Sequence, residues 1–404
     1  MNRIAGTNTI HGPQPHRIRQ LEDLLLEQSG QVSTLEPLDD FYNDEPRGQG
    51  WVAQLPPNAH LPLGSAHNPR ATGGRGRGDL ARLKALMEAA ERICLSTIPR
   101  EALRYGSVSE FDNCLTAEAF PTPWRDSPVW RMPLHWCEAT KIGSPSSPPI
   151  LIPAQLVYCP FRETDERAML WDPSSNGAAA GFSVEDAVVR ATREAFERHA
   201  IMLSHYLRLN GRELDWRDLA LEPGPMAMAM EATALGLGIR VACLVETPFP
   251  VVVCCVVDPS GRFPALTTGS ACGVSLEEAV GGAMSEALYA RRQARDFLTN
   301  VAAVDARELE TIEDRVVYWG QPQTIERLDY LFGSSMPLEG TYTNGFLDEG
   351  YVADITTPLF AKAGISVVKV VHPRLQPLFF AEGEKRILGD PDASSISSEP
   401  HPYA

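Results

Sequence analysis

The sequence predicts an α/β (α+β) domain in which mixed sheets are flanked by long helices. Three Ala-rich segments have the spacing of charged and apolar residues that is typical of long helices: residues 79–95, 172–206 and 276–295. Three β-branched runs are typical of buried strands: residues 239–245, 251–258 and 364–372. Because helices alternate with pairs of strands along the chain, we expect sheets and helices to pack in layers.

The first half of the chain is expected to consist of loops with short elements between them. Residues 16–28 have the spacing of one helix that ends at Gly30. Residues 33–70 are rich in Pro, Asp and Asn and predict a loop, with a short strand at 51–55. The Gly-Arg segment 71–78 also predicts a loop, after which Asp79 caps the first long helix. Two further strands are expected, at residues 134–140 and 149–158.

In the second half, the segment 172–206 opens with a polar turn and continues as a long helix. Residues 226–235 predict a helix that ends at Gly236. A Pro248–Phe249–Pro250 corner separates the strands at 239–245 and 251–258. A helix is expected near residues 323–332, and a loop at 344–350.

Composition divides the chain into three parts and excludes several classes of protein. We expect an N-terminal extension (1–49), a main domain (50–390) and a Pro-containing tail (391–404). The net charge of −16 argues against a nucleic-acid-binding protein, because phosphate affinity requires accumulated Lys and Arg. The longest apolar run, 249–257, is too short to span a membrane, and no secretory signal is evident. Eight Cys without a CxxC pair predict a reduced, cytoplasmic protein.

Charged faces on the three long helices are the main candidate for a functional site. The pattern ExxER occurs twice, and a related acidic and basic face occurs once: Glu88, Glu91 and Arg92; Glu194, Glu197 and Arg198; Glu286 with Arg291, Arg292 and Arg295. Residues three and four apart lie on one side of a helix. A solvated, salt-bridged face is the ordinary explanation of one such pattern. Two copies in apolar helices favour convergence on one Mg²⁺–nucleotide site, and they suggest an internal pseudo-repeat.

The usual signatures of nucleotide-binding and hydrolytic enzymes are missing. The chain has no GxxxxGK[ST], HExxH or GxSxG motif, and the GLG at 236–238 follows a helix, which is the wrong order for a dinucleotide fingerprint. His199 and His205 do not share a helical face, so we interpret both as structural. Glu, Arg, Ser, Asn and Gly remain, and these residues suit polyphosphate binding through Mg²⁺ and backbone amides.

These segments together resemble the YcaO family. SNGAAAG followed by TREAFERHA resembles its second signature, the Gly-Arg loop with KALMEAAER its first, and TTGSACG with SEALYARR its third. KVVHPRLQPLFF is similar to the family's late strand and turn, and the likeness covers residues 50–404. The resemblance implies a YcaO-type fold and an enzyme that uses ATP and Mg²⁺ to phosphorylate a peptide backbone amide oxygen. Attack by a Cys, Ser or Thr side chain of the substrate would then give a thiazoline or oxazoline.

The resemblance also assigns roles to residues of this chain. Four carboxylates would hold the metal: Glu88, Glu91, Glu194 and Glu197. Seven residues would bind the nucleotide: Arg75, Arg92, Ser175, Asn176, Arg198, Glu286 and Arg291. The chain departs from the family pattern at Arg75, Lys84 and Tyr289, which supports the alternative of a non-catalytic scaffold that binds peptide.

The C-terminal tail distinguishes between subclasses of the family. Azoline-forming members tend to end in Pro-x-Pro-x-Pro, and this chain ends in Pro400-His401-Pro402-Tyr403-Ala404. We therefore expect a tail that reaches the active site through Pro400, Pro402 and Ala404, with disorder as the ordinary alternative. Amidine or thioamide formation remain alternatives. The expected partners are a ribosomal precursor peptide and a separate leader-recognition or E1-like protein; homodimerisation is compatible with the sequence.

Overall fold

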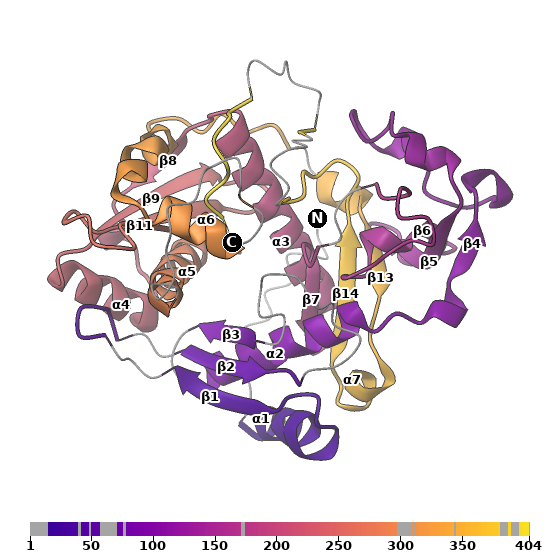
Figure 1. Ribbon diagram of the computed structural model, residues 1–404, viewed down its shortest axis with the longest axis horizontal. Helices are drawn as coiled ribbons and strands as arrows, with labels where there is room; N and C mark the ends of the chain where they lie inside the picture. Colours follow the sequence, from indigo (N-terminus) through magenta and orange to yellow (C-terminus); the bar gives the residue numbers. More distant parts are fainter. Residues whose placement is uncertain are drawn as a thin grey trace.

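The computed structural model describes residues 15–38, 42–47, 50–56, 71–75, 78–170, 174–296, 309, 312–342, 345–379, 387–388 and 396–403. It confirms the predicted α/β class: three sheets are joined by long helices (Figure 1). Within this part of the chain, no helix is both long and apolar enough to cross a membrane.

A five-stranded sheet forms one side of the molecule. Its strands lie in the order β11 (Leu266–Cys272), β10 (Val251–Val257), β9 (Gly238–Val245), β8 (Gly211–Leu214) and β12 (Phe332–Gly333). All neighbours are antiparallel except β12 and β8. Strand β10 is apolar throughout because both of its faces are covered. Val252, Cys254 and Val256 pack with α4 (Pro223–Ala234) and α5 (Leu276–Asp296), and the alternate residues pack with α3 (Val184–Tyr206).

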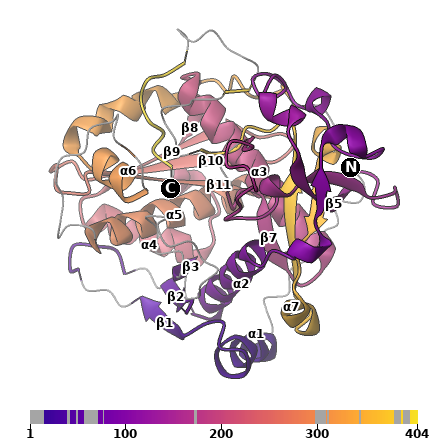
Figure 2. The same ribbon diagram turned by 45° about the vertical axis from the view of Figure 1, so that its right-hand side comes forward.

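A six-stranded sheet forms the other side. Its main path runs β4 (Arg104–Gly106), β5 (Leu134–Lys141), β13 (Tyr351–Asp354), β14 (Ser366–Val371) and β7 (Ala178–Gly181), and β6 (Ile150–Pro153) pairs with β5. Helix α3 packs on β7 and β14 and also reaches β11, so it lies between the two large sheets (Figure 2). Small residues allow this close packing: a Cβ atom at Gly181 would lie 2.5 Å from the Ala187 nitrogen.

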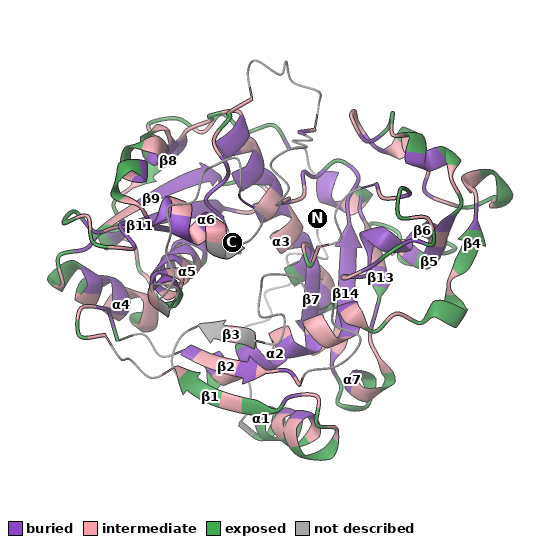
Figure 3. Ribbon diagram, viewed as in Figure 1, coloured by how far each residue is buried: buried purple, intermediate pink, exposed green. Residues whose placement is uncertain are grey.

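The third sheet contains β1 (Thr34–Leu38), β2 (Gly50–Gln54) and β3 (Ala71–Arg75). Helix α2 (Gly78–Ser96) covers it and also contacts β7. The described parts of the N-terminal extension therefore pack on the domain, since β1 pairs with β2 and Glu22 of α1 (Pro15–Glu22) pairs with Arg82. Buried residues follow the central strands of the two large sheets and the inner sides of α3 and α5, whereas β1, β4 and α1 are largely exposed (Figure 3).

Several elements differ from their sequence prediction. The expected helix 16–28 changes from α1 to π-helix at Asp23–Gln28, and the expected loop at 71–78 contains strand β3. Strand β6 ends at Pro153 and continues as a 3-10 turn, and Pro322–Leu331 is a 3-10 helix rather than an α-helix. Other 3-10 turns are Arg100–Ala102, Val108–Glu110, Ala117–Ala119, Pro128–Arg131, Trp216–Asp218 and Phe346–Glu349, and the remaining α-helices are α6 (Ile312–Trp319) and α7 (Pro358–Lys362).

Candidate nucleotide and metal site

The second ExxER pattern lies on α3 at the centre of the molecule. Both of its carboxylates face the cation that follows them: Arg198 Nη1 lies 3.2 Å from Glu197 Oε1, and Arg198 Nε lies 3.9 Å from Glu194 Oε1. Although burial opposes the charge on Arg198, Glu197, Glu194 and Glu286 raise its pKa. Glu286 of α5 therefore acts electrostatically on the same guanidinium, and its role in nucleotide binding stays a prediction.

Strand β11 holds Glu197 in place. Ser270 Oγ donates to Glu197 Oε1 at 2.6 Å, and the Cys272 N–H donates to Oε2 at 3.0 Å. The opposite side of the same strand packs closely on α5 because Gly269 has no side chain: a Cβ atom there would lie 2.4 Å from backbone atoms of α5. Glu197 is consequently a buried carboxylate with three donors, and its orientation is fixed before any ligand binds.

The first ExxER pattern lies on α2 and binds backbone amides of neighbouring strands. Glu91 Oε1 accepts from the Ala180 N–H of β7 at 2.8 Å, and Glu88 Oε2 accepts from the Gly73 N–H of β3 at 2.9 Å. The other Glu88 oxygen accepts from Arg92 Nη2 at 2.9 Å. The two helices thus present one carboxylate cluster from opposite sides of β7.

Burial, with a smaller contribution from mutual repulsion, raises the pKa values of two of these carboxylates. Burial raises the pKa of Glu91 to about 8, and the charges of Glu194 and Glu88 add to the effect. Burial also raises the pKa of Glu194 to about 7, with Glu197 and Glu88 contributing. A divalent cation between α2 and α3 would remove this penalty, so the residues present fit Mg²⁺.

The protein alone does not complete a metal site. Among the described residues, no three His, Cys, Asp or Glu side chains are grouped as a ready metal-binding set. Mg²⁺ usually binds one or two protein carboxylates, waters and phosphate oxygens. The arrangement therefore suits an ion that is shared with a polyphosphate. Glu88, Glu91, Glu194 and Glu197 stay predicted ligands.

A cavity of about 40 Å³ adjoins Arg198. Its polar lining includes Arg198, Asn176, the Ser174 segment and Lys369 of β14. Asn176 Nδ2 donates to the Leu378 carbonyl at 2.9 Å, which ties the predicted phosphate-binding turn to the segment after β14. Ser175 is exposed beside this turn, and its carbonyl accepts from the Ala178 N–H.

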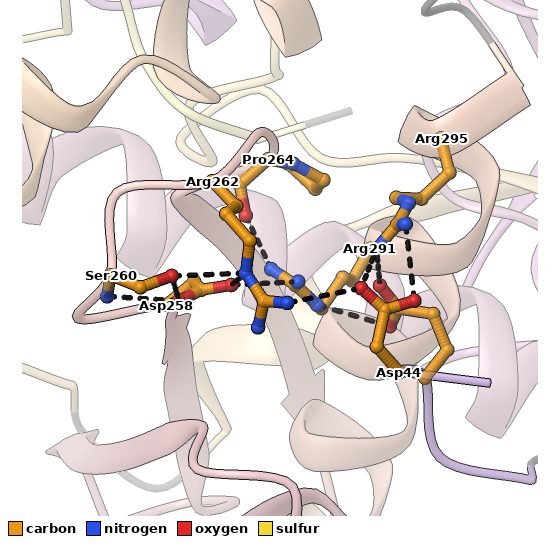
Figure 4. Close-up of polar contacts among 8 residues, drawn as sticks. Asp44, Asp258, Ser260, Arg262, Pro264, Arg291 and Arg295 are labelled. Atoms are coloured by element: carbon orange, nitrogen blue, oxygen red, sulfur yellow. Dashed lines mark hydrogen bonds and ion pairs between the residues drawn. The ribbon is translucent and has the colours of Figure 1, made fainter. Parts of the chain in front are cut away.

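Arg291 does not join these residues. Its guanidinium is fully buried, donates to Glu45 at 3.0 Å and to Asp258 at 3.4 Å, and also binds the Pro264 carbonyl (Figure 4). Arg295 extends the cluster to Asp44. The sequence placed Arg291 among the nucleotide ligands, but the structure shows it tying α5 to residues 42–47 and to the end of β10.

Some of the other predicted residues lie at the site, and some lie outside the described part of the chain. Arg92 pairs with Glu88 at the edge of the carboxylate cluster. The side chain of Arg75 and the whole of Ala404 lie outside the described residues. Two site residues were missed from the sequence: Ser270, which binds Glu197, and Lys369, which lines the cavity. A lone Lys within a run of Val on a predicted buried strand was the available signal.

The end of the described tail, residues 400–403, is buried against the domain, whereas residues 396–399 are half-buried or exposed. The Pro402 carbonyl accepts from Thr268 Oγ1 at 2.8 Å, and the His401 carbonyl accepts from Arg315 Nη1 of α6 at 2.8 Å, beside which Figure 1 places the C-terminus. Pro400 and Pro402 are both buried. Thr268 and Ser270 point to the same face of β11 because side chains alternate along a strand. The tail thus ends beside the strand that holds Glu197.

This fold and these clustered carboxylates and cations are typical of an enzyme that binds a magnesium–nucleotide. Comparison with protein families gives a match to "YcaO cyclodehydratase, ATP- and Mg²⁺-binding" over residues 73–376, most of the 404-residue chain. The chain belongs to the YcaO family, and ATP and Mg²⁺ are its cofactors. A comparison with curated protein sequences produced no match.

Solved structures share the fold at low sequence identity. A heterocyclase in complex with substrate and cofactor is 17% identical with a TM-score of 0.68, over 90% of this chain and 52% of the other. This chain therefore spans about half the length of that heterocyclase. YcaO from Methanopyrus kandleri bound with AMPPCP and Mg²⁺ is 17% identical, with a TM-score of 0.63 and coverage of 93% and 94%. The E. coli microcin synthetase McbBCD complex with pro-MccB17 is 14% identical, with a TM-score of 0.65 and coverage of 92% and 96%.

Proposed function

We propose that this protein is an ATP- and Mg²⁺-dependent cyclodehydratase that forms a thiazoline or oxazoline in a ribosomally made precursor peptide. The observation that carries the proposal is the convergence of α2 and α3. Glu88 and Glu91 come from α2 and Glu194 and Glu197 from α3, their charges act on one another across the two helices, and Arg198 pairs with Glu194. A scaffold that only bound peptide would gain nothing from carboxylates that repel one another.

The protein groups would act by binding and orientation. Glu88, Glu91, Glu194 and Glu197 would hold Mg²⁺, and Arg198 with Asn176 would bind phosphate oxygens. ATP supplies a phosphoryl group: the amide oxygen bonds to the γ-phosphorus as the bridging P–O bond to ADP breaks. A substrate Cys, Ser or Thr loses its proton and bonds to the amide carbon, and phosphate leaves with the amide proton. The peptide loses one water in total.

The tail supports azoline formation over the other products. Residues 400–403 are buried, and the Pro402 carbonyl accepts from Thr268, two residues from the Ser270 that orients Glu197. Pro residues restrict the backbone, so the end of the chain has a defined reach toward the site. We propose that Pro400, Pro402 and Ala404 order the substrate side of the site. In this proposal the tail (391–404) reaches the active site of the catalytic domain (50–390).

Partners follow from the same proposal. The E. coli neighbour is a complex with pro-MccB17, which suggests by analogy a precursor peptide and a separate partner protein that recognises its leader. Intact protein should be incubated with ATP, Mg²⁺ and candidate peptides rich in Cys, Ser or Thr, with and without such a partner. Mass spectrometry then measures the peptide.

Loss of one water in the wild type, and its absence in Glu194→Gln, would support the proposal. Fragmentation distinguishes azolines from a macrocyclic amidine, which has the same mass change. Glu185→Gln is the matched control, because Glu185 lies exposed on the same helix, and it should react as the wild type does. Peptide binding without ATP turnover, in the presence of the partner, would favour the scaffold instead.

A further inference from the structure

Lys369 is a buried cation in an apolar strand. It lies in β14, between β7 and β13, where it is opposite Ala178 and Ala353. Its neighbours in the strand are four valines, and only 3% of the residue is exposed. An ammonium removed from water is unfavourable unless other groups take up its charge and its three donors.

The structure provides one acceptor for those donors. Within the described residues, Lys369 Nζ donates to the Ser174 carbonyl at 2.6 Å, and this is its one hydrogen bond. Two N–H donors are therefore left for a ligand. The cavity described above lies next to this group, and at about 40 Å³ it has room for more than one water.

The same cavity has a second cation and no acid in its lining. Arg198 lies there with Asn176, and the described lining residues include neither Asp nor Glu. Two carboxylates outside the lining pair with Arg198: Glu197 at 3.2 Å and Glu194 at 3.9 Å, and Glu194 also acts electrostatically on Lys369. The cavity itself is thus lined by two cations on the side that adjoins the proposed metal ligands. The chemistry of the cavity suits a phosphate group that binds the same proposed Mg²⁺ ion as Glu194 does.

We propose that Lys369, with Arg198, forms the subsite for the phosphoryl group that the enzyme transfers. This inference rests on the proposed function, since it assumes that ATP binds between α2 and α3. In this position the ammonium would contact the γ-phosphoryl oxygens of ATP, not the adenosine or the inner phosphates. The positive charge on Lys369 would stay near the phosphoryl group during the transfer, while the bond between the phosphoryl group and ADP breaks and the bond between the phosphoryl group and the amide oxygen forms.

The test compares nucleotides that differ only beyond the β-phosphate. Affinities of the full-length protein for ADP and for AMPPCP, each with Mg²⁺, are measured by calorimetry in the wild type, Lys369→Met and Lys362→Met. Met has a similar unbranched length to Lys and suits an apolar strand. Lys362 is exposed on α7 and serves as the control.

We expect Lys369→Met to weaken AMPPCP binding by about 10- to 100-fold, the value of a charge-assisted hydrogen bond, while ADP binding changes less than about twofold. The thermal midpoint should be unchanged or higher, because a buried charge has been removed. Equal loss for both nucleotides, no loss for either, or failure to fold would each overturn the inference. A wild type that binds neither nucleotide would instead refute the proposed function, and the inference with it.

Discussion

The variant Arg291→Met tests whether Arg291 stabilises the fold or binds the nucleotide. The residue belongs to the third charged helix, so its sequence position suggested a contact with phosphate. In the structure its guanidinium is 0% exposed and binds Glu45 and Asp258, whose side chains are each 2% exposed. We therefore expect Arg291→Met to lower stability without affecting the nucleotide site.

The size of the effect follows from what the two acids retain. Removing one partner of a buried ion pair lowers the free energy of unfolding by about 3–5 kcal/mol. Glu45 keeps Arg295 at 2.8 Å, and Asp258 keeps Arg262 at 3.1 Å, so neither carboxylate loses every partner. We expect a loss near the lower limit, about 3 kcal/mol, and a melting temperature lower by roughly 5 °C. Burial already raises the pKa of Glu45, and losing Arg291 should raise it further.

Denaturant titration measures the free energy of unfolding, and calorimetry measures the affinity for AMPPCP with Mg²⁺. Arg291→Met should bind the nucleotide within about twofold of the wild type. Arg198→Met is the comparison variant, and we expect it to weaken binding by about 10-fold or more, because it would remove the proposed charge-assisted phosphate contact. If Arg291→Met kept full stability but lost nucleotide affinity, the structural role assigned to Arg291 would be wrong.

Three further predictions concern the site and the tail. Burial raises the pKa from 4.5 to about 7 for Glu194 and to about 8 for Glu91, so the affinity for the Mg²⁺–nucleotide should increase as pH rises from about 6 to 9. For the same reason, the nucleotide-free protein should lose stability as pH rises above 4.5. An affinity that does not depend on pH would contradict both assignments. Ser270→Ala should lower the free energy of unfolding, measured in denaturant, by about 1–2 kcal/mol and weaken nucleotide binding, because Glu197 loses its 2.6 Å donor. Ser285→Ala on α5 is the control for nucleotide binding. Equal loss of nucleotide affinity in both variants would argue against the role assigned to Ser270. Glu399 Oε2 accepts hydrogen bonds from Tyr318 and Arg327 at 2.8 Å each, so Glu399→Gln should expose the tail to limited proteolysis. The variant should lower turnover more than it lowers the affinity for ATP. A tail as protected from proteolysis as in the wild type would show that Glu399 does not hold it.

The sequence predicted the three long helices because their periodicity is local. Glu194 and Glu197 each pair with Arg198 within about one helical turn, so their spacing was sufficient. Arg291 was misplaced for a geometric reason: it follows Glu286 by five residues, which is about 140° around a helix of 3.6 residues per turn. The two side chains therefore point in different directions, and only tertiary structure shows that Arg291 meets Glu45.

The missed features depend on contacts between distant segments. Strand β7 has the sequence AAAG, which has little β propensity, and it forms a strand because it pairs with β14. Lys369 binds Ser174, 195 residues earlier, and Ser270 binds Glu197 across 73 residues. No local pattern encodes such pairs.

Phosphate release from ATP by the wild type and Glu194→Gln, with Mg²⁺ and substrate peptide, tests most directly whether α2 and α3 form one magnesium–nucleotide site. Glu194 contacts Arg198 and is electrostatically coupled to Glu88 across the two helices. We predict Mg²⁺-dependent release in the wild type and in the Glu185→Gln control, and loss of at least about 100-fold in Glu194→Gln, equivalent to about 2.7 kcal/mol. Undiminished release by Glu194→Gln would contradict the assignment of the site.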